Sequence, residues 1–119
     1  MFAIAEKETF NAEAVQDACN EAAMAARVAA KAFYDQHGDR DCCGFAWVNV
    51  YGVRSNSRLG KTLQSYGFRK DYTGSLSLWN PSGSPTQSIS IKEAGAYAYA
   101  EVLKQKLGLD KVYAGSRMD

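Results

Sequence analysis

Basic and aromatic side chains alternate between residues 54 and 79 of this 119-residue chain. From Arg54 to Tyr72 the chain carries five bases and one acid, whereas the remainder carries nine bases and twelve acids. Guanidinium and ammonium groups bind phosphate oxygens, and aromatic rings stack on nucleobases. The pattern therefore predicts a site for an anion that carries a flat ring. Its candidate residues are Arg54, Phe68, Arg69, Tyr72, Trp79 and Asn80, of which Asn80 adds an amide able to contact a base edge.

The same pattern also fits an alternative in which the aromatic rings form the core and the charges point to solvent. Under this alternative Phe68 and Trp79 are the best candidates for core positions, and Arg69 is a candidate for an exposed one.

The segment Gly60-Lys61-Thr62 resembles the end of a phosphate-binding P-loop. The full pattern needs a glycine five residues before Gly60, and that position is Ser55. A nucleoside triphosphatase is therefore not expected, although a simple phosphate contact by Lys61 and neighbouring amides stays open.

Catalytic groups lack partners in this sequence. The single histidine, His37, follows a helical stretch, so neither Cys42 nor any serine has an obvious base. One histidine and no C-x-x-C motif leave zinc few ligands. We therefore expect a protein that is not an enzyme, with no catalytic residue, no metal and no cofactor.

Composition predicts one cytoplasmic domain spanning residues 1–119. A hydrophobic content of 46% is ordinary for a globular protein, and no apolar run approaches the roughly 18 residues that span a bilayer. The start, MFAIAEKETF, lacks the pattern of a signal peptide. Three cysteines, an odd number, favour a reducing compartment and are expected to be small buried residues: Cys19, Cys42 and Cys43.

The elements predicted from periodicity give an α+β fold, with an antiparallel or mixed sheet of about four strands and helices on one face. Helices are predicted at residues 12–36, 58–66 and 90–107, the last opened by the capping box Ser90-x-x-Glu93. Strands are predicted at residues 44–51, 75–79, 87–89 and 111–114, with an extended segment at 68–72 and a loop at 80–85.

Two elements leave alternatives open. The first helix carries an alanine-rich stripe, which suits either close contact with another helix or subunit, or packing on the chain's own sheet. The strand at 44–51 has one apolar face and one face where Asn49 lies among aromatic residues. The tail after residue 114 supplies two further candidates for ligand contact, Arg117 and Met118, as a lid over a ligand or as a mobile end.

Five segments resemble a known family: G-F-A-W-V at 44–48, G-F-R-K-D-Y at 67–72, L-W-N-P-S at 78–82, Q-S-I-S-I-K-E-A-G-A at 87–96 and Y-A-G-S-R-M-D at 113–119. Together they are similar to the first Thoeris anti-defence family of small phage proteins. The resemblance covers residues 42–119, the expected ligand-binding part, and leaves out the first helix.

The resemblance implies an oligomer built on dimers in the cytoplasm of an infected bacterium. It would sequester, without cleaving, the glycocyclic ADP-ribose signal of a TIR-domain protein. In such a pocket a ring stacks on adenine, arginines hold the diphosphate and an asparagine contacts base or ribose. The residues of matching type are Phe68 or Tyr72 for stacking, Arg54, Arg69 and Arg117 for phosphates, and Asn80 for the polar contact.

Two other functions stay open. A single-stranded nucleic-acid-binding module would use the same basic and aromatic face, although a net charge of only +1 makes nucleic acid a less expected partner. A protein-binding inhibitor of a host defence enzyme would use the alanine-rich helix or the polarised surface. No membrane partner is expected.

Overall fold

The computed structural model describes residues 12–38, 42–71, 73–84 and 88–118. No helix within these ranges is both long and apolar enough to span a bilayer. The elements are helices α2 (Ala12–His37), α3 (Arg58–Ser65) and α4 (Ile89–Leu107), and strands β1 (Gly44–Val50), β2 (Arg69–Lys70), β3 (Leu76–Trp79) and β4 (Val112–Met118).

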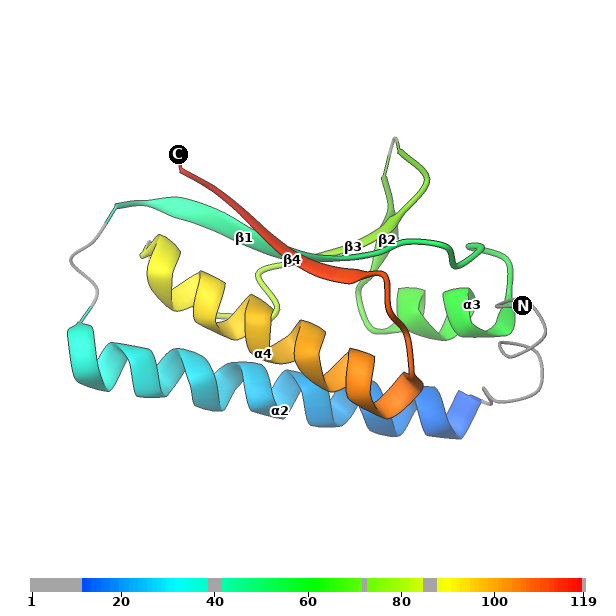
Figure 1. The fold of residues 1–119 in the computed structure, drawn as a ribbon, viewed down its shortest axis with the longest axis horizontal. Coiled ribbons are helices and arrows are strands. Elements are labelled where there is room, and N and C mark those ends of the chain that lie inside the picture. Colours follow the sequence, from blue (N-terminus) through cyan, green and yellow to red (C-terminus); the bar gives the residue numbers. More distant parts are fainter. Residues whose placement is uncertain (1–11, 39–41, 72, 85–87, 119) are drawn as a thin grey trace.

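The four strands form one antiparallel sheet in the order β2-β3-β1-β4. The three described helices lie on one side of it, with α4 next to the sheet and α2 on the far side of α4 (Figure 1). The α+β fold with four strands and helices on one face is therefore confirmed. None of the helices described above covers the other side of the sheet, and we call that side the open face (Figure 1).

The alternation in β1 separates the two sides of the sheet. Ala46, Val48 and Val50 point to the helices and are fully buried in the core. The intervening side chains point to the open face, because successive residues of a strand project to opposite sides. These outward residues are Phe45, Trp47 and Asn49.

The alanine-rich stripe of α2 packs mainly on α4. Small side chains such as Ala22 and Ala26 let the two helices approach closely. At Gly95 of α4 an added Cβ would lie 3.4 Å from the carbonyl oxygen of Ala26. The stripe therefore serves a contact between two helices of the same chain.

Helix α3 begins after Ser57, whose hydroxyl accepts a hydrogen bond from the backbone amide of Gly60. Leu59 and Leu63 are fully buried, as expected from their spacing. An added Cβ at Gly60 would overlap the carbonyl oxygen of Arg54, so this glycine allows close backbone packing. The P-loop-like segment is thus part of a helix that docks on the core.

The start of α4 differs from the prediction. Ser88, two residues earlier, is the N-cap and accepts from the amide of Ile91. The predicted strand at 87–89 is wrong where it is described, because Ser88 makes only an isolated bridge to Cys43 and Ile89 is helical. The predicted capping box is also wrong. The carboxylate of Glu93 instead accepts a hydrogen bond from the hydroxyl of Ser116 in β4.

Two further expectations are corrected by the structure. Residues 115–118 are not a tail, because β4 continues to Met118 and pairs with β1 as far as Gly44. Of the three cysteines only Cys19 is buried, whereas Cys42 and Cys43 are exposed just before β1. The thiol of Cys19 shares a hydrogen bond with Tyr99, and its burial raises its pKa to about 11.

Candidate functional site

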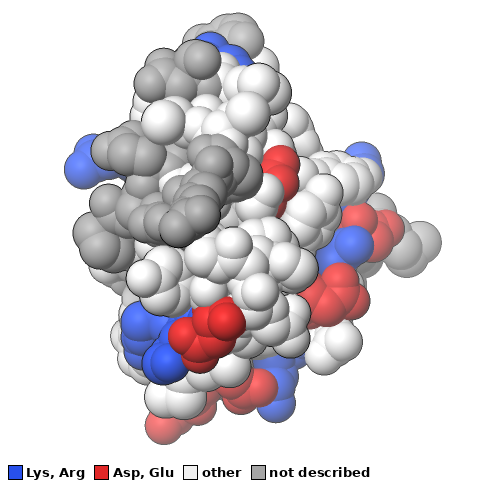
Figure 2. Space-filling view, turned by 90° about the vertical axis from the view of Figure 1, so that its left-hand side faces the viewer, with Lys and Arg blue, Asp and Glu red and all other residues white. Residues whose placement is uncertain are grey.

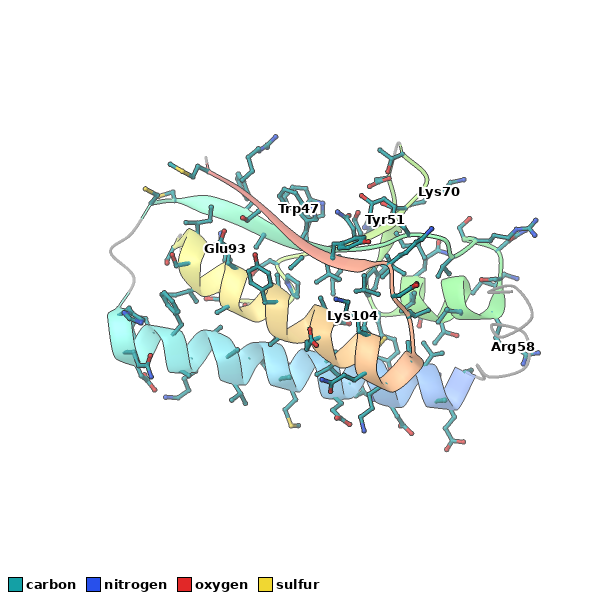
Figure 3. The ribbon with its side chains drawn as sticks, in the orientation of Figure 1. Trp47, Tyr51, Arg58, Lys70, Glu93 and Lys104 are labelled. Atoms are coloured by element: carbon teal, nitrogen blue, oxygen red, sulfur yellow. The ribbon has the colours of Figure 1, made fainter. Side chains whose placement is uncertain are left out.

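The open face of the sheet carries a row of outward side chains from three strands. In the register of the sheet, Trp47 of β1 lies between Trp79 of β3 and Gly115 of β4. One step along, Phe45 lies opposite Arg117 of β4. Figure 3 shows the side chain of Trp47 on the side of the sheet turned away from the helices.

The two tryptophans form the centre of an aromatic cluster. The ring centroids of Trp47 and Trp79 are 5.0 Å apart, and Phe45 meets Trp79 edge-on at 5.9 Å. An added Cβ at Gly115 would come within 2.7 Å of the indole nitrogen of Trp47, so this glycine makes room for the indole. Trp79 remains 55% exposed. The cluster therefore presents an aromatic surface to solvent.

A cavity of about 380 Å³ opens beside these rings, within the size range of small-molecule sites. It combines indoles with amide, hydroxyl, carboxylate and guanidinium groups. Its lining residues are Trp47, Asn49, Tyr51, Asp71, Thr73, Ser77, Trp79 and Arg117.

The carboxylate of Asp71 organises one wall of this cavity. It accepts hydrogen bonds from the backbone amides and hydroxyls of Thr73 and Ser75 and from the hydroxyl of Ser77. These bonds, of which the one from the Thr73 hydroxyl has the largest effect, hold the pKa of Asp71 well below its usual range. A carboxylate with this low a pKa and this many donors is a weak proton acceptor. Asp71 therefore fits the role of a fixed hydrogen-bonding centre better than that of a general base.

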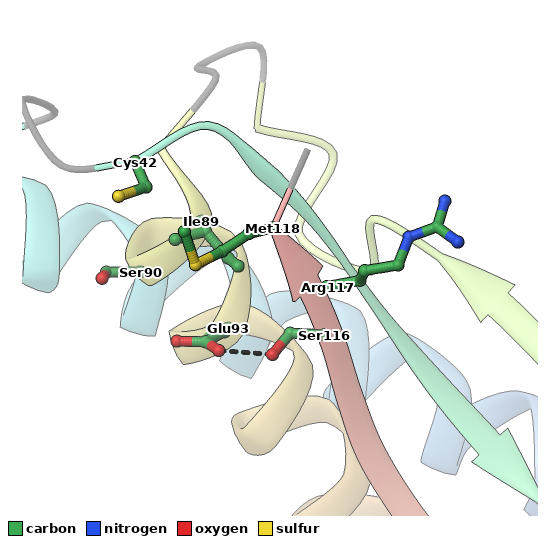
Figure 4. Close-up of a pocket in the computed structure, with 7 residues that line it drawn as sticks. All are labelled: Cys42, Ile89, Ser90, Glu93, Ser116, Arg117 and Met118. Carbon is green, nitrogen blue, oxygen red and sulfur yellow. Dashed lines mark hydrogen bonds between the residues drawn. The ribbon is translucent and has the colours of Figure 1, made fainter.

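Arg117 brings the positive charge. A second cavity of about 470 Å³ lies at the end of β4, beside the first turn of α4. Arg117 borders both cavities, but in Figure 4 its guanidinium points away from the other six lining residues of the second one. The guanidinium is thus available to the cavity on the open face. Met118, in contrast, lines only the second cavity.

The structure brings together some of the residues that the sequence selected. Trp79 and Arg117, 38 positions apart in the chain, line the same cavity. Arg69 is exposed and lies opposite Ser77 in the register, which places it on the open face near the cavity. Tyr72 lies outside the described residues.

Other predicted site residues lie elsewhere. Phe68 is 1% exposed and packs against Tyr99 in the core, so its ring has no free surface for stacking. Asn80 has a left-handed backbone and its amide nitrogen donates to the carbonyl of Ser84, which holds it within its own loop. Arg54 is exposed in the loop before α3 and does not line the cavity. None of these three residues lines the cavity on the open face.

Sequence reasoning missed the residues that complete the cavity. Trp47 and Asn49 lie on the polar-aromatic face of β1, and Tyr51 follows the strand directly. The alternation of this segment is the signal that could have identified them. Asp71 gave a weaker signal, and Ser77 gave none. An aspartate followed two and four residues later by hydroxyl side chains favours a turn held by its carboxylate.

Charges of both signs lie on the surface. Figure 2 shows one end of the molecule, where acidic and basic side chains lie close together and much of the surface is uncharged. Within the described parts of the chain, no group of three or more histidine, cysteine or acidic residues is arranged to hold a metal ion. The cavity on the open face thus offers stacking, hydrogen bonding and one guanidinium.

No family model, curated protein or solved structure matches this chain.

Proposed function

We propose that the cavity on the open face binds a nucleotide and holds it without chemical change. The observation that carries this proposal is the meeting of Trp47, Trp79 and Arg117 at one cavity. A nucleobase stacked on an exposed indole gains about 1–3 kcal/mol, and a guanidinium forms charge-assisted hydrogen bonds with phosphate. The size of the cavity, about 380 Å³, suits one nucleotide better than an extended strand.

The biological role that we propose is sequestration of a cyclic nucleotide signal, of the glycocyclic ADP-ribose type, by a phage anti-defence protein. The resemblance to the first Thoeris anti-defence family supports this role. The cavity supports it through its chemistry, because Asp71 is a weak proton acceptor and no histidine lines the site. A protein that sequesters a ligand removes one ligand molecule for each of its sites and needs no catalytic group. A pre-formed binding site is therefore sufficient for this role.

The proposal is tested by titrating the protein with glycocyclic ADP-ribose, ADP-ribose and 3′,5′-cyclic AMP. Trp47 and Trp79 are the only two tryptophans of the chain, so intrinsic fluorescence reports directly on the cavity. We expect saturable quenching that is lost in Arg117→Ala and kept in the matched control Arg54→Ala. Absence of quenching and of calorimetric heat with every ligand would contradict the proposal.

A second candidate function is supported by the position of the two tryptophans. They lie side by side on the two central strands of a four-stranded sheet, β1 and β3. Sheets of RNA-binding domains stack two or three bases on aromatic residues in a similar way. This function predicts affinity that increases with oligonucleotide length and falls steeply with salt. Saturation by a single mononucleotide-sized ligand, independent of length, would exclude it.

We also propose that the protein forms a homo-oligomer through β4. This strand lies at the edge of the sheet, and its outer backbone groups can pair with a second copy. Tyr113 and Met118 of β4 are more than half exposed. Light scattering coupled to size exclusion would show a dimer or a larger assembly, and a concentration-independent monomer would contradict the proposal.

A further inference from the structure

Ser77 has one hydroxyl proton and two acceptors within reach. Its Oγ lies 2.5 Å from Oδ1 of Asn49 and 3.1 Å from Oδ2 of Asp71. A serine donates only one hydrogen bond, so the two contacts cannot both be donated by Ser77. Since Ser77 is only 8% exposed, its unmatched contact has little access to water. Ser77 therefore donates in only one of the two contacts, and the other contact needs a donor from its partner.

Of the three groups, only the amide of Asn49 can change its role. Asp71 is ionised because its pKa is lowered, and an ionised carboxylate only accepts hydrogen bonds. The nitrogen and oxygen of an amide are assigned from their partners. If Nδ2 of Asn49 faces Ser77, it donates to Ser77 and Ser77 donates to Asp71. Every contact is then a hydrogen bond, whereas the opposite orientation leaves two acceptors facing each other.

This orientation determines what Asn49 presents to the cavity. In the orientation in which Nδ2 donates to Ser77, Oδ1 is the end of the amide that is left for the cavity that Asn49 lines. A free amide can turn over to suit either a donor or an acceptor, but an amide held by Ser77 and Asp71 cannot. The cavity therefore offers a fixed acceptor one register step from the indoles of Trp47 and Trp79.

We infer that Asn49, positioned by Ser77 and Asp71, selects ligands whose ring carries an exocyclic amino group over those with a carbonyl in its place. The inference rests on the proposed function and specifies which class of base the site prefers. An amino group donates to Oδ1, whereas a ring carbonyl at the same place sets acceptor against acceptor. Discrimination by a well-placed polar side chain is about 5- to 150-fold.

The test uses ADP-ribose, which carries an amino group at C6 of the ring, and inosine diphosphate ribose, which carries a carbonyl there and a proton on the neighbouring N1. Calorimetry should show the wild-type protein binding ADP-ribose at least about fivefold more tightly. Asn49→Leu should lose this preference but still bind both ligands through stacking. Asn20→Leu, at an exposed position on α2, is the matched control and should keep the preference.

A second variant separates selection from positioning. Ser77→Ala leaves Asn49 in place but frees its amide to turn, so the preference should collapse while ADP-ribose still binds. Asp71→Asn should act in the same direction, because an amide at this position can donate to Ser77. Ser77 then donates to Asn49 instead, so Oδ1 of Asn49 turns toward Ser77 and no longer faces the cavity. Thermal unfolding of each variant reports whether the fold is retained.

The outcomes separate this inference from the proposed function. Equal binding of the two ligands by the wild-type protein, or an unchanged preference in Asn49→Leu, overturns the inference and leaves the nucleotide site standing. An unchanged preference in Ser77→Ala overturns the positioning role. No binding of either ligand overturns the inference, and no binding of glycocyclic ADP-ribose and 3′,5′-cyclic AMP as well overturns the proposed function.

Discussion

Replacing Phe68 and Trp79 by alanine, one at a time, compares two aromatic rings that look equivalent in the sequence. Phe68 is 1% exposed and Trp79 is 55% exposed. We expect Phe68→Ala to reduce stability strongly without a direct effect on the ligand site. We expect Trp79→Ala to reduce ligand affinity with little effect on stability.

The expected magnitudes follow from burial. Removing a fully buried phenylalanine costs about 3–5 kcal/mol, because transfer energy is lost and a cavity remains. Trp79 loses mainly its ring contacts with Phe45 and Trp47, worth about 1 kcal/mol. With a urea m-value of about 2 kcal/mol/M, the midpoint should fall by about 2 M for Phe68→Ala and about 0.5 M for Trp79→Ala.

Urea unfolding followed by circular dichroism measures the stability of each variant, and calorimetry measures its affinity. Loss of one stacked base at Trp79 corresponds to about 1–3 kcal/mol, or roughly 5- to 150-fold in Kd. If Trp79→Ala loses as much stability as Phe68→Ala, or binds ligand as tightly as the wild type, the assignment of Trp79 to the site is refuted.

Three further perturbations test other parts of the structure. Gly60→Ala should lower the free energy of unfolding by about 1–3 kcal/mol in urea titrations, because the added Cβ overlaps a backbone carbonyl; a gain, as helix propensity alone predicts, would refute this. The folded-state pKa of Asp71 is depressed, so its contribution to stability is present above about pH 4 and is lost as pH falls further. Thermal unfolding between about pH 2 and 6 should therefore vary less with pH in Asp71→Asn than in the wild type. A thiol reagent should modify Cys42 and Cys43 in the native protein and reach buried Cys19 only after unfolding, as thiol counting by mass spectrometry would show.

The sequence predicted the elements whose signals are local. The apolar positions of α2 recur over 26 residues, and the alternation in β1 separates core from open face without reference to any other segment. The end of β4 had no such signal. Gly115 and its neighbours resemble a tail, and they form a strand because β1 supplies hydrogen-bonding partners and the indole of Trp47 needs the space at Gly115.

The site was only partly predictable because it depends on which side of the sheet each residue faces. Trp79 is at an exposed position of β3, whereas Phe68 enters the core just before β2. Their sequence surroundings, both aromatic and polar, do not distinguish the two positions. Asn49 stood out among aromatic residues, but its contact with Ser77 joins two residues that are 28 positions apart in the sequence.

We have proposed that the cavity on the open face holds a nucleotide without changing it. The most direct measurement incubates the purified protein with glycocyclic ADP-ribose, removes free ligand, denatures the protein by heat and analyses the supernatant by mass spectrometry. We expect stoichiometric release of intact ligand by the wild-type protein and almost none after Arg117→Ala. Release of an altered product, or no ligand retained by the wild type, would contradict it.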